Sequence, residues 1–153
     1  MADIAAKLTE LAITLPAAAP PAANYVSFVR SGTMLYISGQ LPFVDGKLLF
    51  PGQLGGSVSP EQGYLAARQC AINIIAQIHA AGSLESVRRI VRVGGFVSSS
   101  PDFIQHPEVV NGASDLFVAV FGDAGRHARA AVGVAALPRG ASVEVEAVVE
   151  IEG

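Results

Sequence analysis

The segment 127–150 contains the side chains best placed to do chemistry. Arg129 stands at the start of one apolar stretch, and Glu144 lies inside the next. Strand side chains alternate between faces, so Arg129 shares its face with the small residues Ala131 and Gly133. A guanidinium and a carboxylate on such uncrowded strand surfaces could flank a pocket for a small anionic molecule. Charged residues on the wet face of a strand are also commonly just solvated, so the pattern alone leaves both interpretations open.

Two hydroxyl side chains are further candidates. Ser38, in Ser38-Gly39-Gln40, ends an expected strand, and functional residues often gather at strand ends. The same hydroxyl could equally close a turn. Tyr25, at the start of the preceding strand, could be a core residue or a pocket hydroxyl, and the sequence does not decide between them.

The sequence favours a site without metal or cofactor. His79, His106 and His127 are far apart, and Cys70 is the single cysteine, so no metal-ligand spacing occurs. His127 remains a candidate because it stands two residues before Arg129. Cys70 lies at the edge of an apolar helical stripe, which is typical of a core thiol. The glycines of the segment 39–57 match neither a Gly-Lys-Ser/Thr loop nor a Gly-x-Gly-x-x-Gly turn, so no phosphate cradle is indicated.

Length and composition predict one domain that associates with other subunits. A chain of 153 residues can build one core. Its 51% hydrophobic and 15% charged residues, with a mean hydropathy of +0.46, predict apolar surface facing another subunit. A net charge of −3 disfavours nucleic acid as a partner. Prolines interrupt the longest uncharged run, 11–29, so we expect no membrane span. A lone cysteine and the lack of a secretory signal at the start favour the cytoplasm.

The elements that must position these residues follow from periodicity and capping signals. Strands and helices alternate in an order typical of an α+β or mixed α/β domain, with two helices covering one face of a sheet. We divide the chain into an N-terminal helix and linker, 1–23, and a domain, 24–153. The expected elements are a helix over 2–13, an extended Ala/Pro linker over 17–23, strands over 25–30 and 34–38, a long loop over 39–57, a helix from the N-cap Ser59 to Gly82, a strand over 87–97 with a bulge or close backbone approach at Gly94-Gly95, a helix from Pro107 to Gly122 and two C-terminal strands.

These motifs together resemble the reactive intermediate deaminase (RidA/YjgF) family, whose members are also called L-PSP endoribonucleases or translation inhibitors. Tyr25 stands thirteen residues before Ser38-Gly39-Gln40, and Val110-Asn111 lies in the second long helix. The most specific match is Ala-Arg-x-x-Val-x-Val-x-x-Leu-Pro-x-x-x-x-Val-Glu-Val-Glu-Ala, which begins at Ala128. The resemblance covers roughly residues 25–150.

The resemblance implies a chorismate-mutase-like fold and a homotrimer with three clefts between subunits. It also implies cofactor-independent hydrolysis of 2-imino acids to 2-keto acids and ammonia. Arg129 would grip the substrate carboxylate, and Glu144 would position or activate the attacking water. The residues that would line the cleft are Tyr25, Ser38, Gly39 and Asn111.

Several positions depart from the family pattern. Ala131 replaces a cysteine that many members have, His127 and Asn24 replace prolines, and the N-terminal extension and glycine-rich loop are longer. These features resemble a longer subgroup and leave the substrate open. Periodicity alone would pair the last two strands as a hairpin across residues 137–140, whereas the family fold places the final strand elsewhere in the sheet.

Two other functions compete with hydrolysis. A non-catalytic trimeric module could hold a small carboxylate metabolite on Arg129 without turnover. An endoribonuclease or translation inhibitor is the third hypothesis. The acidic pI of about 5.5 and the lack of a histidine pair for general acid and base catalysis argue against RNA cleavage.

Overall fold

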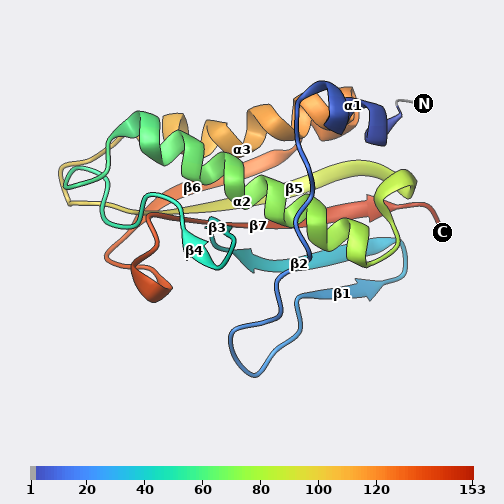
Figure 1. Ribbon diagram of the computed structural model, residues 1–153, viewed down its shortest axis with the longest axis horizontal. Helices are drawn as coiled ribbons and strands as arrows, with labels where there is room; N and C mark the ends of the chain where they lie inside the picture. Colours follow the sequence, from blue (N-terminus) through green and yellow to red (C-terminus); the bar gives the residue numbers. More distant parts are fainter. Residues whose placement is uncertain (1–2) are drawn as a thin grey trace.

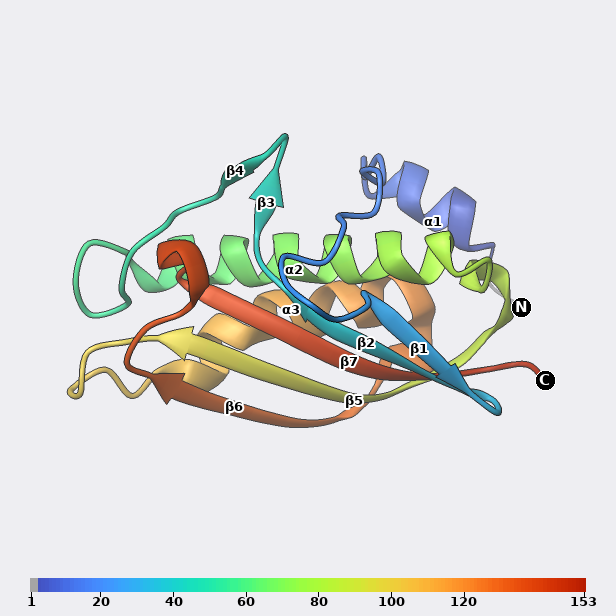
Figure 2. The ribbon, with the colours of Figure 1, turned by 90° about the horizontal axis from the view of Figure 1, so that it is seen from below.

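The computed structural model describes residues 3–153 and shows two layers, a five-stranded sheet and a pair of long helices (Figure 1). Helices α2 and α3 cover one face of the sheet, and no helix within residues 3–153 covers the other face (Figure 2). The α+β architecture agrees with the prediction. The elements run in the order α1 (Ile4–Glu10), β1 (Phe28–Ser31), β2 (Met34–Gln40), β3 (Phe43–Val44), β4 (Lys47–Leu48), α2 (Pro60–Ala80), β5 (Val87–Ser98), α3 (His106–Phe121), β6 (Ala128–Val134) and β7 (Val143–Ile151), with 3-10 turns at Leu84–Ser86, Gly122–Gly125 and Pro138–Gly140.

The sheet order β1-β2-β7-β5-β6 places the last strand at the centre. β7 pairs antiparallel with both β2 and β5, and β6 pairs parallel with β5 at the sheet edge. The last two strands are therefore not a hairpin, and the placement that the family resemblance implied is confirmed. Val143, Val145 and Val149 of β7 are fully buried because both the central position and the helices cover them.

Helix α2 begins where the capping signals placed it. The Ser59 side chain accepts a hydrogen bond from the Gln62 amide, and the Gln62 side chain accepts one from the Ser59 amide, which completes a capping box. Helix α3 has Pro107 in its first turn and Gly122, with φ 62°, as its C-cap. The two helices cross closely at Gly112, where any Cβ would clash with the Tyr64 carbonyl.

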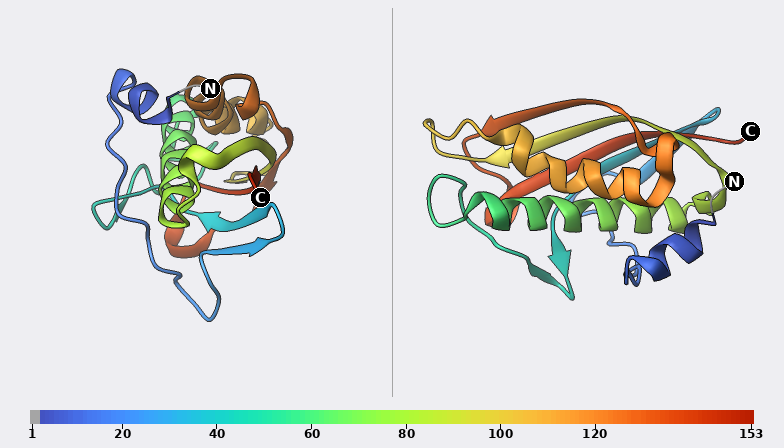
Figure 3. Two further views of the ribbon diagram at one scale, coloured as in Figure 1. Left: turned by 90° about the vertical axis from the view of Figure 1, so that its right-hand side faces the viewer. Right: turned by 90° about the horizontal axis from the view of Figure 1, so that it is seen from above.

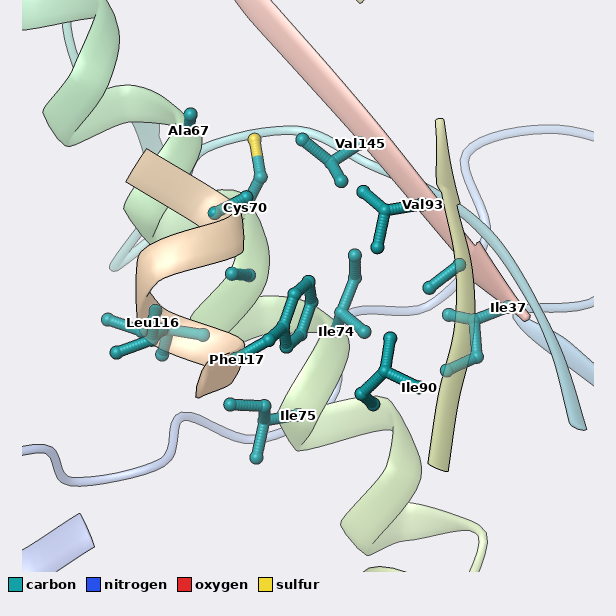
Figure 4. Packing of buried hydrophobic residues seen from close by; sticks show 14 of the residues in the cluster. Ile37, Ala67, Cys70, Ile74, Ile75, Ile90, Val93, Leu116, Phe117 and Val145 are labelled. Carbon is teal, nitrogen blue, oxygen red and sulfur yellow. The ribbon is translucent and has the colours of Figure 1, made fainter. Parts of the chain in front are cut away.

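The core lies between the helix pair and the sheet. Phe117 projects from α3 among Ile74 and Ile75 of α2 and Ile90 and Val93 of β5 (Figure 4). The Cys70 thiol is also fully buried, and this burial raises its pKa well above the usual range. Cys70 is therefore a core residue, as predicted.

Several expected boundaries were wrong. The loop 39–57 contains the two-residue strands β3 and β4, joined by Asp45 and Gly46, which both have positive φ. Such a turn matches the strand twist and closes a hairpin. The first helix ends at Glu10, well before Pro16, because Ala12 adopts a left-handed φ of 57°. The first strand starts at Phe28 and not at residue 25.

Gly94 and Gly95 mark close approaches, not a bulge. The register shifts of β5 fall earlier, between Val87 and Arg89 and between Ile90 and Arg92. A Cβ on Gly95 would lie only 2.6 Å from the Val110 methyl groups of α3, so the glycine lets this helix approach the sheet.

The N-terminal segment lies along the outside of the helix layer. After α1, the chain crosses α2 and descends to β1 (Figures 1 and 3). We call its Ala/Pro part, residues 16–23, the strap. The Gln77 side-chain amide of α2 donates a 2.8 Å hydrogen bond to the Ala19 carbonyl and holds the strap there. None of the helices in the range 3–153 is both long and apolar enough to cross a membrane.

Candidate functional site

Glu144 lies at a cavity of about 380 Å³ on the side of the sheet near the strap. Tyr25 and Gly39, two other residues selected from the sequence, line the same cavity. Strap residues 19–23 form another part of its wall, together with Leu41 and Phe43. One chain therefore gathers three of the six candidate residues around one concave site.

The space above Gly39 positions the Glu144 carboxylate. A Cβ at Gly39 would collide with Oε2 of Glu144, so only glycine leaves this space free. Within residues 3–153 the carboxylate forms no hydrogen bond or ion pair. Burial, and to a smaller degree the nearby Glu146, raises the pKa of Glu144 above its usual value. A raised pKa suits a group that must both accept and return a proton.

Ser38 has a structural contact in place of a position on the cavity wall. Its hydroxyl donates a 2.7 Å hydrogen bond to the Val26 carbonyl and joins β2 to the segment that precedes β1. Ser27, whose carbonyl pairs with the Ser38 amide, lines the cavity instead. This bond closes no turn, because Ser38 lies inside β2 and its hydroxyl's partner is twelve residues away.

Arg129 lies on edge strand β6 and is held by α3. One guanidinium nitrogen, Nη1, donates to Asn111 Oδ1 at 2.9 Å and to Ser114 Oγ at 3.1 Å. Nη2 donates to the Pro107 carbonyl at 3.4 Å. These three bonds leave two of the five guanidinium N–H groups, Nε–H and one on Nη2, for another acceptor. This pair is geometrically suited to one carboxylate.

His127 extends this hydrogen-bond network. Its Nδ1 lies 2.6 Å from the Gly125 carbonyl and must be the protonated nitrogen. Nε2 then accepts from the Ser114 hydroxyl at 2.8 Å, which leaves the Ser114 oxygen lone pairs for Arg129. Burial lowers the pKa of His127 and favours this neutral form. His127 thus helps to orient Arg129 through Ser114.

Arg129 and Glu144 do not meet within one chain. Arg129 pairs in register with Val93, whose side chain faces the helices. Glu144 alternates with the buried Val143 and Val145 and therefore points to the helix-free face. The sequence suggested that Arg129 and Glu144 could flank one pocket. Within a single chain they do not, because their side chains lie on opposite faces of the sheet. Side-chain alternation within each strand could not reveal this relation between the two strands.

Sequence reasoning missed four polar residues of the Glu144 cavity, Ser27 among them. Gln40 was assigned only to the loop that follows the second strand and Asn73 only to a helix, although the Asn73 amide bonds the Leu41 and Phe43 carbonyls and holds the cavity floor. Arg139 was treated as part of a turn, yet it also lines the cavity. Its charge, five residues before Glu144, was the available signal. No group of three or more His, Cys, Asp or Glu side chains within residues 3–153 could hold a metal ion.

Comparisons with known proteins place these features in context. A family model described as YjgF/chorismate mutase-like matches residues 5–150. Protein TCP17 of Trypanosoma cruzi is 54% identical over 97% of this chain and 94% of its own length. A 2-iminobutanoate/2-iminopropanoate deaminase of Dermatophagoides farinae is 31% identical over 92% of this chain and 95% of its own. The crystal structure of Atu1372 from Agrobacterium tumefaciens has a TM-score of 0.91 at 50% identity and covers 97% of this chain and 92% of that one.

Proposed function

Because the chain belongs to the YjgF/chorismate mutase-like family, we propose that it hydrolyses 2-imino acids and their enamine tautomers to 2-keto acids and ammonia in a cleft between subunits. The observation that carries this proposal is the division of the site. Within residues 3–153, one chain presents on one sheet face a guanidinium held by α3 with two N–H groups unbonded, and on the other face a half-buried carboxylate that borders a cavity. In the part of the chain that the structure describes, the guanidinium can therefore still donate to a ligand and the carboxylate can still accept from one.

The helix-free face supports association into a homotrimer. Val29, Tyr36 and Val132 on this face are 52%, 48% and 45% exposed, which is unusual for large apolar side chains on a sheet. Burial of such a surface is a standard driving force for subunit association. In the proposed trimer, a neighbouring copy brings its Arg129 and Asn111 to the cavity that holds Glu144.

The proposed reaction needs only orientation and proton transfer. Arg129 of one subunit binds the substrate carboxylate and places the imine carbon beside Glu144 of the next. Water adds to the carbon of the protonated imine while Glu144 takes one of the water protons, which forms a neutral carbinolamine. Glu144 then returns that proton to the amine nitrogen, the C–N bond breaks and ammonia leaves, and the hydroxyl proton passes back to Glu144 as the carbonyl forms. The hydroxyl of Tyr25 and the Gly39 backbone border the reacting atoms.

A coupled assay tests the activity. Threonine dehydratase generates 2-iminobutanoate, and trapping with semicarbazide measures how fast it disappears. The intact protein should accelerate that loss severalfold over the spontaneous rate. Unchanged loss, together with calorimetric binding of 2-oxobutanoate, would instead identify a non-catalytic carboxylate-binding module, because the same guanidinium would then hold a ligand without turnover.

Subunit mixing tests the division of the site. Arg129→Ala and Glu144→Gln should each be inactive alone. When the two variants are co-expressed, some interfaces combine an intact Glu144 cavity with an intact Arg129, so activity should return to a fraction of the wild-type value. A site contained in one chain would not recover. Light scattering should give three times the chain mass for every variant.

A further inference from the structure

Arg139 occupies an unusual backbone position beside the candidate site. The 3-10 turn Pro138–Gly140 joins β6 to β7, and Arg139 within it has φ 60° and ψ 14°. A non-glycine residue in this left-handed region is strained, and such strain persists where the surrounding structure enforces it. Hydrogen bonds of the turn do so here, because the Gly140 amide donates to the Leu137 carbonyl and the Gly52 amide donates to the Gly140 carbonyl.

The Arg139 guanidinium has no acidic partner in the described part of the chain. The salt bridges among residues 3–153 join Lys7 to Glu10 and Arg126 to Asp123. Arg139 is exposed and lines the Glu144 cavity, but it forms no ion pair with Glu144 within 4.0 Å. An arginine held at a cavity rim with its donors unused can bind an incoming carboxylate in a fork.

The cavity between Glu144 and Arg139 is larger than a short imino acid requires. Its volume of about 380 Å³ falls in the range of about 300–1,000 Å³ that encloses drug-sized ligands. Its walls include strap residues 19–23, Leu41 and Phe43, which are mainly apolar. These walls can cover the methylene groups of a side chain that runs from the reacting carbon toward Arg139.

We propose that Arg139 binds an acidic group at the far end of the substrate, so that the cavity prefers imino acids whose side chain ends in a carboxylate. This inference rests on the proposed function for the position of the reacting carbon. In this arrangement the substrate's first carboxylate contacts Arg129 of a neighbouring subunit, its imine carbon lies at Glu144, and its second carboxylate contacts Arg139. The pocket thus discriminates by charge at its distal end.

Binding of stable keto acids tests this preference without turnover. Isothermal titration calorimetry compares 2-oxoglutarate, which has the second carboxylate, with 2-oxobutanoate, which lacks it. Wild-type protein should bind 2-oxoglutarate at least about tenfold more tightly, the size of effect expected from one charge-assisted interaction. Arg139→Gly should reduce that ratio to within about twofold, and its melting temperature should not fall, because glycine relieves the left-handed strain.

Two controls keep the test specific. Arg139→Asn removes the charge while tolerating the same backbone conformation, and it should behave like Arg139→Gly. Arg88→Ala removes an exposed arginine of β5 outside the cavity and should keep the wild-type ratio. The inference is overturned if 2-oxoglutarate does not bind, if the wild-type protein binds both acids equally, or if the preference survives in Arg139→Gly. A preference that depends on Arg139 without hydrolysis of any imine would uphold the inference and remove the proposed catalysis.

Discussion

Arg129 and Glu144 lie on opposite faces of one sheet and are positioned by different means. Helix α3 holds the Arg129 guanidinium, which donates three hydrogen bonds to the Asn111 side chain, the Ser114 hydroxyl and the Pro107 carbonyl. Glu144 has no such partner among residues 3–153, and the space above Gly39 and partial burial determine its position and protonation. The cationic half is therefore preorganised, whereas the acidic half remains adaptable and poorly solvated.

This difference fits the two tasks in the proposed reaction. A carboxylate anchor is most effective when its fork is rigid before the ligand arrives, because little ordering remains to be done on binding. A proton-transfer group benefits from a raised pKa and from freedom to contact first water and then the leaving nitrogen. Substitutions can test whether the Arg129 half depends on its rigid hydrogen bonds and the Glu144 half on its free space and raised pKa.

Loss of the anchor should have the largest effect. Arg129→Ala removes two charge-assisted hydrogen bonds to the substrate, each worth about 1.5–3 kcal/mol, and should lower kcat/KM about 10²–10⁴-fold. Arg126→Ala is the matched control, since this exposed arginine pairs only with Asp123 at the surface and should retain activity. If Arg129→Ala kept more than a tenth of the wild-type rate, the guanidinium would not be the anchor.

Occupying the space above Gly39 should disturb the acidic half alone. The Cβ of Gly39→Ala would displace the Glu144 carboxylate, whose flexible end can move at small cost to folding. We expect kcat/KM to fall about tenfold or more, because catalysis is sensitive to displacements of about 1 Å, with the melting temperature nearly unchanged. Gly94→Ala is the control because it crowds Glu146 on the same face, although less tightly. Equal losses in both variants would contradict a special role for Glu144.

The sequence predicted local elements better than the spatial relation between the two halves. Ser59-Pro60-Glu61-Gln62 determined the start of α2 because capping is a local interaction. The order of the strands depends on contacts between distant segments, so only the family resemblance indicated that β7 does not form a hairpin with β6. Side-chain alternation correctly grouped residues within β6 and within β7 but could not show that Arg129 and Glu144 take opposite faces.

Features that depend on tertiary contacts escaped prediction. The strap lies against α2 because the Gln77 side chain bonds the Ala19 carbonyl, a partner 58 residues away in sequence. The left-handed conformation of Arg139 is imposed by the turn and by Gly52, and arginine itself gives no sign of it. The Ser38 hydroxyl bonds the Val26 carbonyl, a partner twelve residues away that the motif did not indicate.

Weakening the support of Arg129 should have a moderate effect. Ser114→Ala removes the hydroxyl that joins Arg129 to His127 and should lower the free energy of unfolding by about 1 kcal/mol. The looser guanidinium should raise KM about two- to fivefold with little change in kcat. Ser99→Ala breaks another Ser–His pair, with His106, and serves as the control for lost stability alone. An unchanged KM in Ser114→Ala would show that Asn111 suffices to hold Arg129.

The smallest expected effect concerns the pH dependence of stability. The pKa of Glu144 is raised in the folded chain, so the folded state keeps its proton over a pH range where the unfolded state has lost it. Stability should therefore fall as pH rises above the usual carboxyl pKa of about 4.5. Glu144→Gln removes this loss, and urea denaturation at pH 7.5 should find the variant more stable by at most about 0.5 kcal/mol, since the group is only half buried. At pH 4 the difference should vanish. A variant less stable than wild type at pH 7.5 would mean that the ionised carboxylate has a stabilising partner, and the two halves would then be built alike.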